Sequence, residues 1–258
     1  MFPTIWLTVL FTLAGAAVGS FLNVCIARIP EGLSIVSPPS RCPRCGQPIR
    51  FYNNIPLVGF LLLGGKCRDC REKISVRYPL VELLTAVMAW LLFRKYGLTA
   101  AFPAAFAFVC LLIVISFIDL DHQIIPHVLT LAGIPVFAAL AVLFTGLTVL
   151  DAFLGTMIGA AVLYFVAVYY EALTGREGMG GGDVNLLAML GAFLGWKSLL
   201  FILLVSSFLG ALVGLLFILF KGKDLKYAVP FGPSLCVAAV VYLFFGDHLM
   251  SIFFSNGF

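Results

Sequence analysis

Apolar runs long enough to cross a lipid bilayer dominate this chain of 258 residues. A membrane-spanning helix needs about 20 mostly apolar residues, because the backbone polar groups must be hydrogen-bonded within the helix where water is absent. By that rule the sequence predicts an all-α polytopic membrane protein with about eight transmembrane helices. The predicted spans lie near residues 4–27, 79–96, 99–118, 127–145, 150–171, 184–196, 198–220 and 228–246. The composition agrees, since 62% of the residues are hydrophobic and only 11% are charged.

Basic residues are distributed unevenly between the loops that join these spans. If the N-terminus lies outside, thirteen lysines and arginines fall in the segments that would be cytoplasmic, which are 28–78, 119–126, 172–183 and 221–227. Only Arg94, Lys95 and Lys197 fall on the opposite side. An excess of basic residues marks cytoplasmic loops, so the pattern predicts this orientation. The net charge of +4 is too small to indicate a nucleic-acid partner, and the expected surrounding is the lipid bilayer.

Two acidic residues interrupt the apolar pattern at the ends of predicted spans. Asp119 follows the run at 99–118, and Asp183 follows a glycine-rich turn at 178–182 and precedes another apolar run. A carboxylate in hydrocarbon costs several kcal/mol, so such acids indicate function. Two close carboxylates cannot both ionise easily, so one can take a proton from water while the other polarises a carbonyl. The pair therefore predicts aspartic-protease chemistry, and the glycines would let the backbone approach a substrate closely.

Neither acid has an unambiguous interpretation from the residues alone. Asp121 competes with Asp119, because it lies two residues further on, before His122. The alternative for Asp121 is that it accepts hydrogen bonds from the backbone of the turn before the next helix. Asp183 could cap a helix that begins near Val184, a role that is compatible with catalysis.

Residues 28–78 form a hydrophilic segment with two Cys-x-x-Cys pairs. The four cysteines are Cys42, Cys45, Cys67 and Cys70, with 21 residues between the pairs. Each pair can present two thiolates to one metal ion, and two pairs complete a tetrahedral zinc site. Gly46 and Gly65 flank the pairs, where tight turns need a permissive backbone. The segment is therefore predicted to be zinc-ribbon-like; two disulfides are the alternative, which a reducing cytoplasm disfavours.

Five motifs follow one another in an order found in a known protein family. They are residues 19–24 with Arg28 and Pro30, the stretch from Cys42 through 54–57 and 64–67 to 77–83, residues 117–119, residues 178–183, and residues 230–233. In these motifs the chain resembles the bacterial type IV prepilin peptidases, and the resemblance covers nearly its whole length.

The resemblance implies a bifunctional enzyme of the bacterial inner membrane with a periplasmic N-terminus. It would cleave the leader peptide of type IV prepilins or type II secretion pseudopilins after a glycine. It would then methylate the new N-terminal residue with S-adenosylmethionine. The family's catalytic aspartates correspond to Asp119 and Asp183, near the cytoplasmic face, and its cysteine pairs correspond to the four cysteines above.

The same resemblance implies a division of the chain into three parts. Residues 1–27 would be the first transmembrane helix, 28–78 a cytoplasmic zinc-binding segment linked to methylation, and 79–258 the peptidase bundle. It identifies no residues of the methyl-donor site. Glu82 is expected in the first turn of a helix begun by Pro79, where an acid suits the helix dipole, and a role near the methyl donor is the alternative.

This chain departs from the family pattern at two positions. Members often have Pro-Asp where this chain has Pro126-His127, and a lysine where it has Asn185. His127 is interpreted as a residue at the start of a helix, and neither position is expected to carry the chemistry.

Two other functions remain as alternatives, and a third is disfavoured. A peptidase without methyltransferase activity is the nearest alternative. A polytopic transporter with a zinc module would also place acids at breaks between spans. A zinc metalloprotease is disfavoured because the three histidines form no His-Glu-x-x-His pair.

Overall fold

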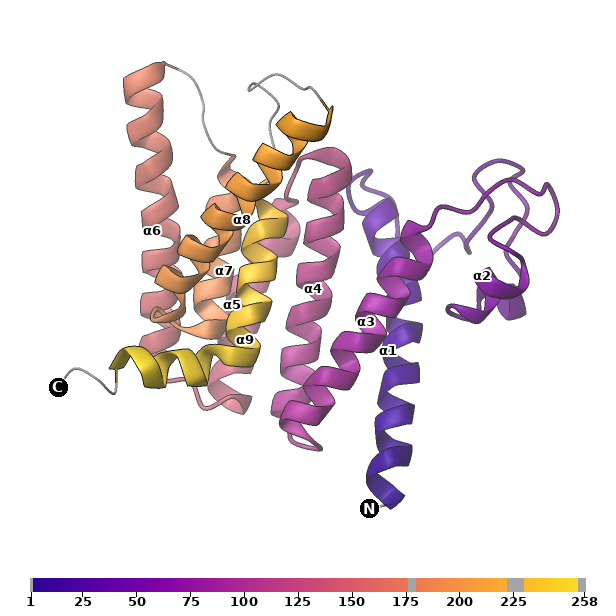
Figure 1. Ribbon diagram of the computed structural model, residues 1–258, viewed down its shortest axis with the longest axis horizontal. Helices are drawn as coiled ribbons and strands as arrows, with labels where there is room; N and C mark the ends of the chain where they lie inside the picture. The colour runs from indigo at the N-terminus through magenta and orange to yellow at the C-terminus, as the bar shows by residue number, and fades with distance from the viewer. Residues whose placement is uncertain (1, 176–179, 222–229, 255–258) are drawn as a thin grey trace. The chain divides into compact units, whose positions relative to one another are not determined.

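The computed structural model describes residues 2–175, 180–221 and 230–254, which belong to two compact units, 1–114 and 115–258. The regular elements of these described residues are helices, so the all-α prediction is confirmed. Among the described residues, eight helices occupy the positions of the predicted spans (Figure 1): α1 (Phe2–Arg28), α3 (Arg77–Tyr96), α4 (Ala101–His122), α5 (His127–Phe144), α6 (Val149–Thr174), α7 (Gly181–Leu194), α8 (Ser198–Lys221) and α9 (Gly232–Phe254).

Judged by length and composition alone, five of these helices could cross a membrane: α1, α4, α5, α6 and α8. Two shorter apolar helices, 181–194 and 232–246, accompany them. The chain is therefore a membrane protein with several spans, and the count of eight stays a prediction.

Several helix ends differ by a few residues from the predicted span boundaries. The span predicted to end at residue 118 continues as α4 to His122, because Leu120 extends the apolar pattern past the first acid. The last span was predicted to begin at 228, but α9 begins at Gly232, and residues 228 and 229 lie outside the described ranges.

Close packing of α1 against α3 organises the first unit (Figure 1). A Cβ atom added at Gly15 would lie 2.5 Å from the Cβ of Ala89, and one at Gly19 would lie 2.7 Å from the Cα of Glu82. Glycines four residues apart let membrane helices approach each other in this way. Phe11 stacks on Phe93 with ring centroids 4.6 Å apart, which extends the contact along the helices.

The segment between α1 and α3 contains little regular structure. It holds a 3-10 turn, η1 (Phe51–Asn54), and one short helix, α2 (Val58–Leu62). Two isolated antiparallel bridges, Arg41 with Pro48 and Lys66 with Lys73, close one small hairpin around each cysteine pair.

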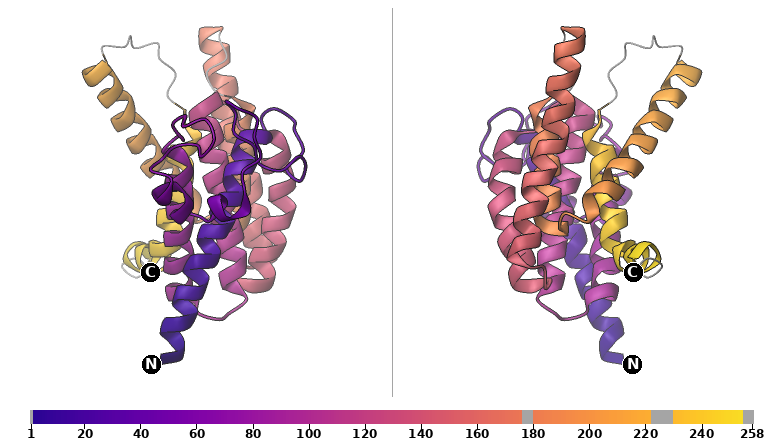
Figure 2. Two further views of the ribbon diagram at one scale, coloured as in Figure 1. Left: turned by 90° about the vertical axis from the view of Figure 1, so that its right-hand side faces the viewer. Right: turned by 90° about the vertical axis from the view of Figure 1, so that its left-hand side faces the viewer.

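Helix α7 is the centre of the second unit, where it packs against α5, α6 and α9. Figure 2 shows the helices from two further sides. Every residue from Leu186 to Phe193 is buried, which explains why this short helix is apolar on all sides. A Cβ atom at either Gly155 of α6 or Gly191 of α7 would overlap the carbonyl oxygen of the other. The two helices are therefore in backbone contact, and this position tolerates only glycine without a shift of one helix.

Candidate active site and metal centre

Asp119 lies in the last turns of α4 and is only 5% exposed. Its Oδ2 accepts a hydrogen bond of 3.0 Å from the backbone N–H of Gly232, the first residue of α9. The first N–H groups of a helix have no partner within the helix and carry partial positive charge, so they stabilise an anion. A Cβ atom at residue 232 would lie 2.6 Å from Oδ2, so this contact depends on glycine.

Asp183 is the third residue of α7 and does not cap it, because the N-cap residue is Gly180. The interpretation of Asp183 as an N-cap was therefore wrong by three positions. Its buried Oδ1 has no hydrogen-bond partner among the residues that the structure describes. Asp119 lies close enough to Asp183 for a charge on Asp119 to act on the Asp183 carboxyl group. Gly178 and Met179 of the predicted glycine-rich turn lie outside the described residues.

Ile125 connects the surroundings of the two acids. A Cβ atom at Gly182 would lie 2.7 Å from the Cβ of Ile125, and one at Gly232 would lie 3.1 Å from its Cδ1. The linker between α4 and α5 thus packs against both the turn before Asp183 and the start of α9. Cys236, one turn into α9, is buried and interacts with the charges of both aspartates.

Asp121 has a different environment from Asp119. It lies in the last turn of α4, directly before the turn that leads to α5. The side chain of Asp121 is exposed, whereas that of Asp119 is buried. This contrast supports Asp119 as the functional acid of the two.

The two positions at which the chain departs from the family pattern contact each other. The Nδ2 of Asn185, in α7, lies 2.9 Å from the Nδ1 of His127, the first residue of α5. Asn185 is two residues after Asp183, so this pair ties the start of α5 to the turn that carries the second acid. The sequence indicated both departures but not that they form a pair.

The four predicted metal ligands come together in the first unit. Their sulfur atoms all lie within 4.8 Å of one another, and those of Cys42 and Cys70 are 3.8 Å apart. A tetrahedral site with zinc–sulfur bonds of about 2.3 Å has edges of about 3.8 Å. All four cysteines are free thiols, which agrees with a metal site and not with two disulfides.

Both cysteine pairs are held by the same backbone hydrogen bonds. The N–H of Cys42 donates to Gln47 and that of Cys67 to Glu72, at 3.0 and 2.7 Å. Gly46 donates back to Cys42, and Arg71 donates back to Cys67. Arg71 therefore occupies the place of Gly46, with a φ of 60° against 71°. Gly65 flanks the second pair on its N-terminal side and has a positive φ of 69°, so the expected need for a permissive backbone there is confirmed.

The first hairpin also favours the ligating form of one cysteine. A hydrogen bond from the backbone N–H of Cys45 is the main reason why the pKa of the Cys42 thiol is lowered to about 7. The clustering of the four sulfur atoms suits a metal ion such as zinc, which would bind them as thiolates.

Glu82 was predicted to lie in the first turn of its helix. This prediction was wrong, because α3 begins five residues earlier, at Arg77. Its side chain is 8% exposed and accepts a hydrogen bond of 2.8 Å from the backbone N–H of Leu57. The acid thus anchors the cysteine segment to α3 instead of interacting with the helix dipole.

Comparison with known proteins identifies the family. Residues 13–96 match the model of the bacterial peptidase A24 N-terminal domain, and residues 106–215 match that of the type IV leader peptidase family. A protein from Pseudomonas aeruginosa, named prepilin leader peptidase/N-methyltransferase, is 39% identical over 92% of this chain and 90% of its own length. The chain belongs to the type IV leader peptidase family.

Other members of the type IV leader peptidase family with the same printed name are also similar. One from Aeromonas hydrophila is 36% identical over 98% of this chain and 96% of its own length. One from Myxococcus xanthus is 46% identical over 86% of this chain, which spans 66% of that longer protein. No solved structure shows a significant match to this member of the family.

Proposed function

We propose that this membrane enzyme cleaves the leader peptide of type IV prepilins or type II secretion pseudopilins after a glycine, and then methylates the new N-terminal residue. The observation that carries the proposal is the buried pair of Asp119, held by the start of α9, and Asp183, whose Oδ1 has no protein partner among the described residues. Membership of the family and the names of the relatives point to the same reaction.

In the first reaction the two aspartates have different roles. Asp119 is ionised, because the N–H of Gly232 and the positive end of α9 stabilise its charge, and it takes a proton from water. Asp183 is protonated and donates a hydrogen bond from its carboxyl group to the carbonyl oxygen of the scissile bond. The water oxygen bonds to the carbonyl carbon, the C–N bond breaks, and the leaving amine receives a proton.

In the second reaction that amine is methylated by S-adenosylmethionine. The nitrogen lone pair of the neutral amine attacks the methyl carbon, and the bond from carbon to the sulfonium sulfur breaks. The products are a methylammonium group, which can lose a proton to water, and a neutral thioether. Since cleavage creates the amine, cleavage must come first.

The cysteines Cys42, Cys45, Cys67 and Cys70 hold zinc in the cytoplasmic segment in this proposal. The clustering of their sulfurs supports a structural site, because four thiolates leave no open position for catalysis. Zinc there fixes the fold of residues 41–73. The excess of basic residues in the same loops supports an N-terminus in the periplasm and both reactions near the cytoplasmic face.

Substitution of each aspartate tests the peptidase. Asp119→Asn and Asp183→Asn should each lower cleavage of a purified prepilin at least about a hundredfold, because each removes an acid–base group. Asp121→Asn is the matched control and should cleave nearly as well as the wild type. Near-normal cleavage by Asp183→Asn enzyme would refute the assignment of the second acid.

A further inference from the structure

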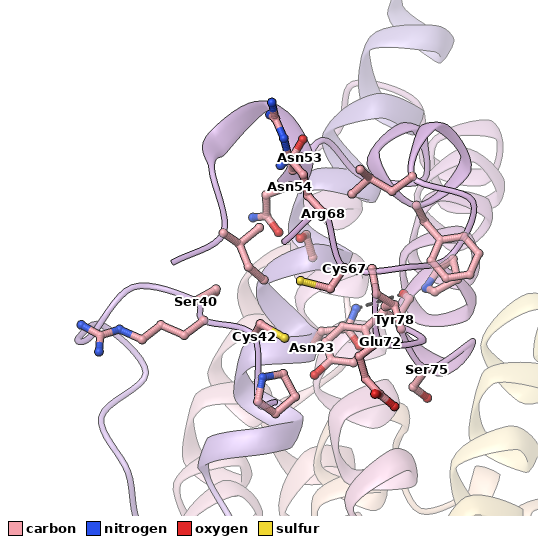
Figure 3. A pocket seen from close by; sticks show the side chains of 18 of the residues that line it. Asn23, Ser40, Cys42, Asn53, Asn54, Cys67, Arg68, Glu72, Ser75 and Tyr78 are labelled. Carbon is pink, nitrogen blue, oxygen red and sulfur yellow. Dashed lines mark hydrogen bonds between the residues drawn. The ribbon is translucent and has the colours of Figure 1, made fainter. Parts of the chain in front are cut away.

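A cavity in the first unit lies between the cysteine segment and the adjoining ends of α1 and α3. It has a volume of about 590 Å³, within the range of about 300–1,000 Å³ that is typical of ligand sites. Asn23 and Arg28 of α1, Tyr78 and Glu82 of α3, and Cys42 and Cys67 of the metal cluster are among its lining residues. Figure 3 shows the side chains of Asn23, Cys42, Cys67 and Tyr78 among those that line the cavity.

Glu82 gives this cavity a buried carboxyl group that has no ion-pair partner among the residues that the structure describes. Its carboxylate accepts hydrogen bonds from the N–H of Leu57 and from Ser20. The ion pair found among the described residues joins Arg44 and Glu72, and none involves Glu82. Removing a carboxylate from water is unfavourable by several kcal/mol unless a cation compensates. A ligand with a positive charge would supply that cation.

Asn23 adds an acceptor with a fixed orientation to the same cavity. Its side chain is 2% exposed, and its Nδ2 donates to the carbonyl oxygens of Gly19 and Tyr78, at 3.3 and 3.0 Å. Because both bonds use the amide nitrogen, the positions of nitrogen and oxygen are determined. The buried Oδ1 has no hydrogen-bond donor among the described residues. After a small movement of the Asn23 side chain, a ligand N–H or O–H group could donate to it.

The remaining lining matches a ligand with an apolar ring and an anionic group. Ile55, Phe60 and Ile74 line the cavity with apolar surface that suits a planar base. Arg28, Arg41 and Lys73 line it with positive charge that suits a carboxylate. S-adenosylmethionine combines a purine, a ribose with hydroxyl donors, a sulfonium and ammonium group, and a carboxylate.

We infer that this cavity is the binding site for S-adenosylmethionine, with the carboxylate of Glu82 balancing the cationic part of the methyl donor and Asn23 Oδ1 accepting one of its polar hydrogens. The inference rests on the proposed methyltransferase function and adds the location of its site. It also gives the metal centre a role, because Cys42 and Cys67 form part of the wall of the cavity.

The test measures the affinity of purified enzyme for radiolabelled S-adenosylmethionine in Glu82→Gln and Glu31→Gln variants. Glutamine keeps an acceptor for Leu57 and Ser20 and removes only the charge, so the fold should persist. We expect the affinity of Glu82→Gln enzyme to fall about tenfold or more, as for the loss of one partner of a buried charge pair. Glu31, which is exposed and does not line the cavity, should tolerate the same change.

Two further measurements keep the outcomes distinct. Prepilin cleavage by Glu82→Gln enzyme reports folding, and ultraviolet cross-linking of the labelled donor to wild-type enzyme should modify peptides that contain residues 20–28, 40–60 or 72–82.

Wild-type enzyme that neither binds the donor nor methylates a mature pilin peptide would refute the proposed methyltransferase function itself. Wild-type binding with less than a tenfold loss in Glu82→Gln, or with cross-links only after residue 114, would refute this location alone. A raised KM for prepilin with unchanged donor affinity would instead assign the cavity to the protein substrate.

Discussion

Gly232 shows how much of the active site depends on one residue without a side chain. Its N–H is the hydrogen-bond donor to Asp119, and its lack of a Cβ leaves room for the carboxylate. The residue belongs to the motif at 230–233, which the sequence indicated without assigning it a role. No local signal connects this glycine to Asp119, which lies 113 residues earlier in the sequence.

Replacing Gly232 with alanine should therefore impair cleavage. The new methyl group would lie 2.6 Å from Oδ2 of Asp119, so the carboxylate or the start of α9 must move and the hydrogen bond is lost. Loss of a hydrogen bond to a charged group corresponds to about 2 kcal/mol, or about a thirtyfold lower kcat. Gly210→Ala in α8 is the control, since its methyl group would come no closer than 3.6 Å to the ring of Phe231. Equal rates for the two variants would argue against the role of Gly232.

The contact between His127 and Asn185 predicts a coupled effect on cleavage. His127→Asp alone would add a carboxylate beside the turn of Asp183, and we expect about a tenfold lower kcat. Adding Asn185→Lys would neutralise that charge across the 2.9 Å contact and restore kcat to within about threefold of the wild-type value. The effects of substitutions at two residues in contact are not additive. A double-mutant cycle on kcat measures this coupling. His248→Asp, at an exposed position of α9, should have little effect, and additive losses at 127 and 185 would contradict the pairing.

At the level of helices, glycines determine which pairs pack closely. The two tightest contacts, α1 with α3 and α6 with α7, both use glycines four residues apart, Gly15 with Gly19 and Gly155 with Gly159. In lipid there is little hydrophobic driving force between helices, so close van der Waals contact stabilises the pair. The α6–α7 contact holds the helix that carries Asp183 in its first turn.

Gly191→Ala should consequently destabilise the second unit. Its methyl group would overlap backbone atoms of Gly155, which cannot rotate away as a side chain can. We expect a loss of about 2–3 kcal/mol in the free energy of unfolding, measured by denaturation in detergent. Gly210→Ala in α8 provides the comparison, because its methyl group would lie 3.6 Å from the ring of Phe231, an ordinary contact. Similar stability of the two variants would show that the α6–α7 spacing is adjustable.

For the whole molecule, the two candidate sites belong to different compact units. The cysteine cluster and the cavity lie within residues 1–114, and the aspartate pair lies within 115–258. Damage to one unit should therefore affect one reaction more than the other.

Cys67→Ser combined with Cys70→Ser tests this division. Purified wild-type enzyme should contain about one zinc ion per chain by elemental analysis, and the double variant should contain none. Because Cys67 lines the cavity, we expect methylation of a supplied mature pilin peptide to fall more than prepilin cleavage. Mass spectrometry separates cleaved from cleaved and methylated product, and Cys110→Ser is the control. Equal loss of both activities in folded, zinc-free protein would indicate one shared site instead.

The sequence by itself determined the helical class, the approximate spans and the set of four cysteines. Each of these follows from local properties: apolar length for a span, and the reach of a Cys-x-x-Cys turn for a metal. Tertiary structure alone decided the partner of Asp119, since Gly232 lies 113 residues away and hydropathy does not specify which helix ends meet. It also decided that Asp119 is buried and Asp121 exposed, that His127 faces Asn185, and that Glu82 lines a cavity. These facts depend on how helices pack side by side, and in a bilayer that packing is set by small residues and shape, not by the apolar pattern shared by every span.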